Sequence, residues 1–136
     1  MQIIRVATLR EVLFCHATAR SDEELFTVRM PEARLREIFA GVEQPVVVCG
    51  HTHVQFDRRL GDMRLVNAGS AGMPYGELGT YWALLRPDVQ LRRTEYDLQK
   101  AADRIRQSGF PGSEDFAVLS VLSPPTTAEA LAFFAG

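Results

Sequence analysis

Three histidines are the residues of this chain whose type and spacing best suit chemistry. His51 and His53 are separated by one residue and follow Gly50, while His16 follows a separate apolar run. All three therefore lie at or just beyond the ends of expected strands, which is where sheets with parallel strands carry their binding sites. Neutral imidazole is the commonest metal ligand in proteins, so His16, His51 and His53 are candidate metal ligands.

Two histidines separated by one residue also occur in ordinary exposed loops, and His16 alone would be read as a core or surface residue. Three neighbouring features favour a functional site. Gly50 lets the backbone approach a ligand closely. The pair follows a strand that is apolar on both sides and therefore rigid. A later glycine-rich loop offers N–H and hydroxyl groups to an oxyanion, which makes Asn67, Gly69 and Ser70 candidate substrate-binding or supporting residues.

The two cysteines, Cys15 and Cys49, are interpreted as buried free thiols of a reducing compartment. They are too few for a disulfide framework and too far apart for a C-x-x-C site. Because neighbouring residues of a strand point to opposite faces, Cys15 should face away from the site if His16 faces it.

Composition indicates one globular domain over residues 1–136, with a core of useful size. The net charge of −2 gives no basic footprint for nucleic acid or for an acidic membrane surface. No apolar run approaches the roughly 20 residues of a membrane span, and no signal peptide is evident. We therefore expect a cytoplasmic protein that acts on a small molecule.

The elements that would position the histidines can be read from the apolar pattern. The run at 46–49 has no alternation, which indicates a strand buried on both faces. A second strand is expected at 11–16, ending at His16, whereas residues 1–10 are weakly patterned. A strand pair is expected on each side of the turns at 60–62 and 87–88. The expected strands are 11–16, 46–49, 54–58, 63–66, 80–86 and 89–96.

Helices are expected mainly in the last third of the chain. An apolar stripe predicts one earlier helix over 32–40. Ser21 with Glu24, and Thr126 with Glu129, have the spacing of capping boxes that begin a helix. The expected helices are 32–40, about 98–105, 113–122 and a last one after Thr126, with a short helical turn at 21–24. The order of strands and helices predicts α/β layers, with helices packed on a mixed sheet.

Two sequence motifs resemble the last motifs of the calcineurin-like metallophosphoesterases. These are Gly-His-Thr-His at 50–53 and Asn-Ala-Gly-Ser-Ala-Gly at 67–72. Phe-Cys-His-Ala-Thr at 14–18 resembles the preceding motif of the same family, in which a strand ends in a single metal-binding histidine. The motifs occur in the family's order over essentially the whole chain, and the match is closest to the small bacterial phosphodiesterase-like branch.

The resemblance implies a four-layer α-β-β-α sandwich that holds two divalent metal ions, commonly Mn, Fe, Zn or Ni. By position, His16 and His51 would bind the second ion and His53 the first. It also implies hydrolysis of phosphodiesters or phosphomonoesters by a metal-activated hydroxide.

The resemblance covers the C-terminal half of such a domain. The family's Asp-x-His, Gly-Asp and Gly-Asn motifs, which include the carboxylate that bridges the metals, do not occur before His16. We therefore expect an N-terminally truncated domain with impaired activity, an exposed sheet edge and possible homo-oligomers through that edge. The alternatives are a non-catalytic remnant or protein-interaction module on the same fold, and a protein that binds one metal through the three histidines.

Overall fold

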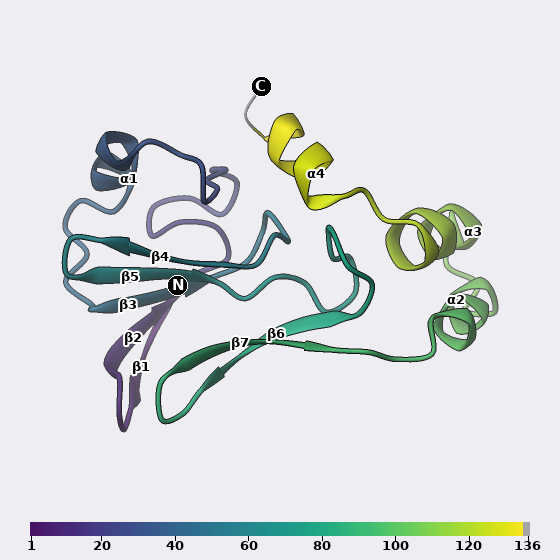
Figure 1. Cartoon of the computed structure of the whole chain (residues 1–136), viewed down its shortest axis with the longest axis horizontal. Coiled ribbons are helices and arrows are strands. Elements are labelled where there is room, and N and C mark those ends of the chain that lie inside the picture. The colour runs from purple at the N-terminus through teal and green to yellow at the C-terminus, as the bar shows by residue number, and fades with distance from the viewer. Residues whose placement is uncertain (135–136) are drawn as a thin grey trace.

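A five-stranded mixed sheet forms the centre of the computed structural model, which describes residues 1–134 (Figure 1). Its strand order is β1-β2-β3-β5-β4. Strands β2, β3 and β5 run parallel, whereas β1 and β4 are antiparallel strands at the two edges. The strands are β1 (Gln2–Val6), β2 (Arg10–Phe14), β3 (Val46–Cys49), β4 (Phe56–Leu60) and β5 (Met63–Asn67).

Strand β3 lies in the middle of this sheet because it has no polar side chain to present to water. All of its residues are buried, so the expected strand with two apolar faces is confirmed. Phe14 pairs with Val48, and Cys49 pairs with Asn67. This register brings the carboxyl ends of the three parallel strands to one edge of the sheet, and every expected site residue follows or ends one of these strands.

Successive side chains of the central strands point alternately into two apolar layers, one on each face of the sheet. One face packs on helix α1 (Glu32–Ile38) and the other on a two-stranded sheet of β6 (Thr80–Leu85) and β7 (Val89–Thr94). Figure 1 shows α1 and the β6–β7 ribbon on opposite sides of the sheet. The first layer includes Leu13, Leu35, Ile38, Val47 and Leu65, and the second includes Val12, Val48, Val66 and Val89. The mixed sheet with packed helices agrees with the predicted α/β class.

The last part of the described chain is helical, with α2 (Leu98–Arg106), α3 (Ser113–Phe116), the π-helix η1 (Ala117–Leu122) and α4 (Thr127–Phe133). The single helix expected over 113–122 is therefore an α-helical turn followed by a π-helical segment. Helix α4 begins with the predicted capping box. The Glu129 N–H donates to the Thr126 side chain, and the Thr126 N–H donates to the Glu129 carboxylate at 2.8 Å.

Three expectations about the first part of the chain are corrected. The weakly patterned N-terminus forms β1, because its backbone pairs along the free edge of β2 although its side chains stay largely exposed. Strand β2 ends at Phe14, so His16 lies in the following loop. Half of the capping box at 21–24 forms, because the Ser21 hydroxyl accepts from the Glu24 N–H at 3.2 Å. The Glu24 carboxylate accepts from Arg20 and Thr18 rather than from the Ser21 N–H, and no helical turn forms.

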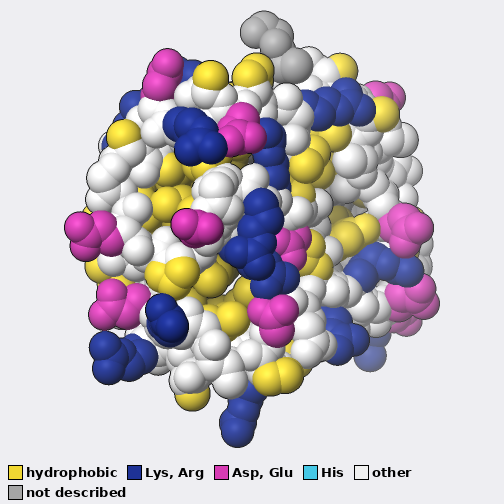
Figure 2. Space-filling model, turned by 60° about the vertical axis from the view of Figure 1, so that its left-hand side comes forward, with side chains coloured by type: hydrophobic (Ala, Val, Ile, Leu, Met, Phe, Trp, Pro, Cys, Tyr) yellow, Lys and Arg dark blue, Asp and Glu magenta, His cyan; other side chains and the backbone are white. Residues whose placement is uncertain are grey.

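Edge strand β1 exposes Ile3 and Ile4, as expected for an uncovered sheet edge. Figure 2 shows basic and acidic side chains interspersed over the visible face, with apolar side chains between them. Within residues 1–134, no single helix is long and apolar enough to cross a membrane. One bent pair, Ser113–Leu122 with Thr127–Phe133, meets that criterion on length and composition alone.

Candidate metal centre at the ends of the parallel strands

His16 and His51 meet at the carboxyl edge of the sheet. His16 lies in the loop after β2 and His51 in the loop after the adjacent strand β3. Their Nε2 and Nδ1 atoms are 3.0 Å apart, and the two rings meet edge to face. The Gly50 N–H donates to the His16 carbonyl at 2.9 Å, which continues the β2–β3 pairing into the loops. The parallel sheet thus fixes the separation of the two imidazoles.

The loop of residues 50–53, called the histidine loop below, has a strained backbone at both of its histidines. His51 has a φ of 63° and His53 a φ of 57°, in the left-handed region that residues with a Cβ rarely adopt. Such conformations cost of order 1–3 kcal/mol each and persist when the surrounding structure holds them. They are concentrated at binding and active sites, so this strain is a second sign that the loop is functional.

Asn67 is the residue that holds this loop in place. Its side chain is completely buried at the end of β5. Its Nδ2 donates to the Gly50 carbonyl at 2.6 Å and to Thr52 Oγ1 at 3.0 Å, while its Oδ1 accepts from the Gly69 N–H at 2.9 Å. Asn67 therefore joins the histidine loop to the glycine-rich loop and supports the site from behind.

His53 has the contacts of an imidazole prepared to bind a ligand through Nε2. Its Nδ1 lies 2.9 Å from the Met73 carbonyl oxygen. A carbonyl can only accept, so the hydrogen of this bond is on Nδ1 and the Nε2 lone pair is free. Metal-binding histidines commonly have this arrangement. Burial lowers the pKa of His53, with smaller lowering by His51 and His16 and an opposing effect of the Met73 bond, so the neutral ring is favoured.

The pair of His16 and His51 suits part of a metal site. The 3.0 Å between the two nitrogens is a hydrogen-bond distance. It is shorter than the about 3.4 Å between two nitrogens on one tetrahedral ion, so the rings would have to separate slightly to bind one. Within residues 1–134, however, no group of three or more His, Cys, Asp or Glu side chains is placed to hold an ion. The structure thus brings His16 and His51, two of the three predicted ligands, into contact. The third, His53, is hydrogen-bonded to the Met73 carbonyl instead.

The cysteines do not add to this donor set. Burial raises the pKa of Cys15 to about 11 and also raises the pKa of Cys49, so both favour the thiol form rather than the metal-binding thiolate. Both side chains pack in the apolar layer against α1. Both thiols are free; the expected burial is confirmed for Cys49, whereas Cys15 is only partly buried.

The glycine-rich loop after β5 is shaped by its own contacts. Ser70 Oγ accepts from the Met73 N–H at 3.0 Å, so this hydroxyl closes a turn. Gly69 has a φ of 80°, and a Cβ there would lie 2.6 Å from the Cβ of Tyr81. Only glycine fits this close approach of β6. The loop leads directly to Met73 and Tyr75, which contact His53.

Sequence reasoning missed Thr52 and Tyr75 as parts of the site. Thr52 is buried and accepts from Asn67. Strand alternation could not have identified it, because both flanking histidines have a left-handed backbone in a loop. Tyr75 stacks on His53 with ring centroids 5.8 Å apart and an interplanar angle of 29°. No spacing in the sequence connects this tyrosine to the histidine.

Solved structures share this fold, among them the following two. The structure of hypothetical protein PH1004 from Pyrococcus horikoshii OT3 is 18% identical, with a TM-score of 0.74 over 92% of this chain and 51% of that one. The structure of a metallophosphoesterase from Sphaerobacter thermophilus is 20% identical, with a TM-score of 0.62 over 79% of this chain and 52% of that one. The chain spans about half the length of each. No curated protein matches the chain.

The family is shown by the sequence itself. The model of the calcineurin-like phosphoesterase superfamily domain matches residues 2–88. This segment is more than half of the chain, and it contains the five-stranded sheet and the loops that carry His16, His51, His53 and Asn67. The resemblance noted in the sequence and the fold expected from it are both confirmed, and the chain belongs to the calcineurin-like phosphoesterase superfamily.

Proposed function

We propose that this chain forms part of a metal-dependent phosphoesterase site, in which His16, His51 and His53 bind divalent ions such as Mn, Fe, Zn or Ni. The contact between His16 and His51, at the ends of adjacent parallel strands, carries this proposal. The neutral His53 ring, with its free Nε2, supports it. The substrate class is a small phosphodiester or phosphomonoester. Divalent ions, when bound, activate water and neutralise charge on phosphoryl oxygens.

The histidines of this chain account for only part of the expected coordination. A divalent ion of this kind takes about four to six ligands, and His16 with His51 supplies two nitrogens. Among residues 1–134 no acidic side chain joins them in a group of three or more ligands. The proposal therefore includes carboxylate ligands supplied by another polypeptide segment. We therefore expect low turnover by this chain alone, and higher turnover once the carboxylates are supplied.

Metal content and turnover together test this function. Bound Mn²⁺ or Zn²⁺ is measured by elemental analysis, and hydrolysis of bis(p-nitrophenyl) phosphate and p-nitrophenyl phosphate is followed with Mn²⁺ present. His51→Ala should remove the bound metal, whereas the exposed control Gln107→Ala should retain it. Metal binding that survives His51→Ala would reject the site. Two ions per chain with rapid turnover would reject the proposal that this chain supplies only part of the metal coordination.

A second candidate function is a non-catalytic interaction module on the same fold. It is favoured by the absence of an acidic partner for the imidazoles among the described residues, where His16 and His51 bond to each other instead. This alternative predicts a folded chain that binds no Mn²⁺ or Zn²⁺ at micromolar concentrations. It also predicts that His51→Ala leaves the metal content of the chain unchanged.

A further inference from the structure

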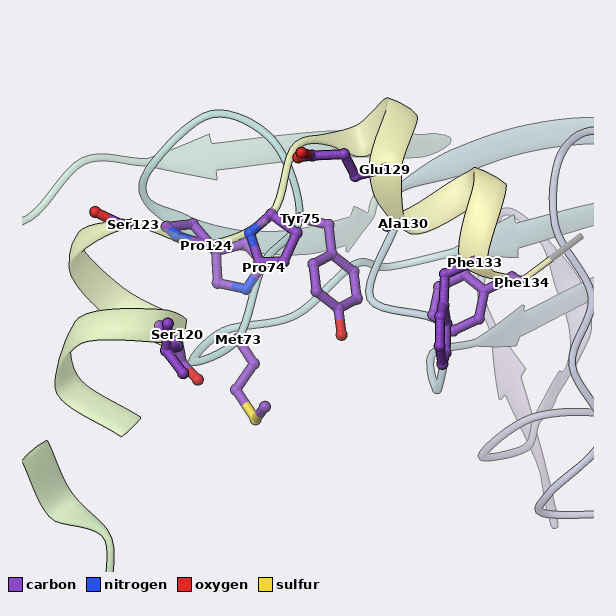
Figure 3. Close-up of a pocket in the computed structure, with 12 residues that line it drawn as sticks. Met73, Pro74, Tyr75, Ser120, Ser123, Pro124, Glu129, Ala130, Phe133 and Phe134 are labelled. Carbon is purple, nitrogen blue, oxygen red and sulfur yellow. The ribbon is translucent and has the colours of Figure 1, made fainter. Parts of the chain in front are cut away.

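An apolar cavity of about 760 Å³ lies directly beside His53. One wall is the segment that follows the glycine-rich loop, and the other is formed by η1, α4 and the residues between them (Figure 3). Its volume is within the range of about 300–1,000 Å³ that is typical of small-molecule sites. Among its lining residues are Met73, Tyr75, Leu119, Glu129, Phe133 and Phe134.

The cavity and the candidate metal centre share a wall. Met73 lines the cavity and gives its carbonyl oxygen to His53, while Tyr75 lines the cavity and stacks on the His53 ring. A group seated against Tyr75 would therefore lie one aromatic ring away from a candidate metal ligand. This separation suits the two ends of a single small molecule.

The far wall is fixed to the histidine loop. Thr127 Oγ1 donates to the Tyr75 carbonyl at 3.1 Å, and the Gly76 N–H donates to the Pro125 carbonyl at 3.1 Å. Val54, which follows His53, packs in one apolar cluster with residues of α4. These contacts connect the start of α4 and the residue Pro125 before it to the Tyr75 segment, and α4 itself to the histidine loop. The cavity is thus held in register with the site.

The chemistry of the lining excludes a phosphate group and favours a flat apolar one. Among the described residues that line the cavity there is no lysine or arginine, and the one charged side chain is Glu129, which would repel an anion. Figure 3 shows the Tyr75 ring between Met73 and Ser120 on one side and Phe133 and Phe134 on the other, with its hydroxyl pointing into the space between them. Aromatic walls of this kind stack favourably on an aromatic guest.

We propose that this cavity binds the apolar, aromatic alcohol part of a phosphate ester, while the phosphate lies at His16, His51 and His53. The inference rests on the proposed function and names its substrate class. The match to the superfamily ends at residue 88, so it includes Met73 and Tyr75 but not the wall formed by η1 and α4. Specificity for the alcohol is therefore supplied by the C-terminal helices of this chain.

Binding of 1-naphthol to the full chain in EDTA tests the cavity without any turnover. The dissociation constant is measured by ligand-observed NMR. Phe133→Ala removes an aromatic wall from a position that is 80% exposed, and its matched control is Phe110→Ala, at a position that is 58% exposed and outside the cavity. We expect about tenfold weaker binding for Phe133→Ala, as for loss of an aromatic anchor, and no change for Phe110→Ala. Leu119→Asp should also weaken binding.

The second arm adds phosphate and metal. With Mn²⁺ present, 1-naphthyl phosphate should bind more tightly than either 1-naphthol or glycerol 2-phosphate, and Phe133→Ala should remove most of its advantage over glycerol 2-phosphate. Absent naphthol binding, or equal effects of Phe133→Ala and Phe110→Ala, would overturn the cavity assignment. So would self-association that Phe133→Ala abolishes in a chain that binds no naphthol. Naphthol binding without any gain from phosphate and metal would instead reject the phosphoesterase site, and with it the cavity's role in that site.

Discussion

The parallel strands and the C-terminal helices of this chain are built in contrasting ways. In the sheet, Leu13 and Leu65 are almost completely buried between two layers. In the helical segment, Leu119 is 60% exposed and Phe133 is 80% exposed, and both line the cavity. The sheet is organised around its own core, whereas the helices keep apolar side chains available at a surface.

On the two proposals above, this difference separates metal binding at the strand ends from recognition of the alcohol by the helices. The strand ends place imidazoles to within a hydrogen-bond distance, and the superfamily match covers this part of the chain. The helices after residue 88 add an apolar wall to the cavity. Reactive groups on a rigid sheet and recognition on a separate segment are a common division in α/β proteins.

The largest expected effect comes from replacing one leucine by alanine in each region and comparing the two losses of stability. Leu65→Ala leaves a cavity between α1 and the sheet and should lower the free energy of unfolding by about 2–5 kcal/mol. Leu119→Ala removes a mostly exposed side chain and should cost less than about 1 kcal/mol. Urea unfolding of both variants measures the difference. Equal losses would mean that the helices carry as much of the core as the sheet does.

The next largest effect is expected where the sheet holds the histidine loop. Asn67→Ala leaves the Gly50 carbonyl and the Thr52 hydroxyl without their amide donor and should cost about 1–3 kcal/mol. It should also shift the ring NMR signals of His51 and His53. Gln55→Ala is the control, because Gln55 is also an amide donor to backbone carbonyls but is only partly buried. Unchanged histidine signals in Asn67→Ala would show that the loop holds itself.

Sequence patterns predicted the sheet region more completely than the site. The uninterrupted valines of β3 and the apolar stripe of α1 determine burial through local periodicity, so their elements were predictable. Strand β1 was missed because its side chains are largely exposed, and its pairing with β2 is a tertiary property. An apolar pattern indicates which side chains are buried, and the side chains of edge strand β1 are mostly not buried.

The site itself was only half visible in the sequence. Strand ends and glycine spacing identified the three histidines and the loop of Asn67. The stacking of Tyr75 on His53 joins residues whose contact depends on the path of the glycine-rich loop. The cavity depends in addition on how η1 and α4 pack against that loop, which no residue spacing encodes.

Removing the N-cap of α4 should destabilise the helical region without destabilising the sheet. Thr126→Ala removes the hydroxyl that accepts from the Glu129 N–H at 3.3 Å and should destabilise α4 by about 1 kcal/mol. Amide hydrogen exchange should quicken in α4 and stay unchanged in β3 and β5. Thr126→Ser retains the hydroxyl and serves as the control. Faster exchange in the strands as well would contradict independent stability of the two regions.

The smallest expected effect is a pH dependence that differs between the two regions. Hydrogen bonding to Arg20 is the main cause that lowers the pKa of Glu24, whose side chain is only 18% exposed beside the loop after β2. Glu114, in the helical region, has its pKa lowered mainly by its hydrogen bond to Arg106, but its side chain is 66% exposed. A lowered pKa in the folded state stabilises the fold above the unfolded pKa, and this contribution is lost as the pH falls through the folded value.

Acidification below the ordinary glutamate pKa of 4.5 should therefore weaken the sheet region through Glu24. Glu24→Gln should flatten this part of the stability–pH curve. The change in the free energy of unfolding should be about 1 kcal/mol or less, because the Glu24–Arg20 ion pair is partly solvated. Glu114→Gln should change the curve less, since water and salt screen an exposed pair. Urea midpoints between pH 3 and pH 6 at low and high salt measure both curves. A larger change for Glu114→Gln would show that charge pairs matter more to the helices than to the loop that carries His16, and would reverse the contrast between the two regions.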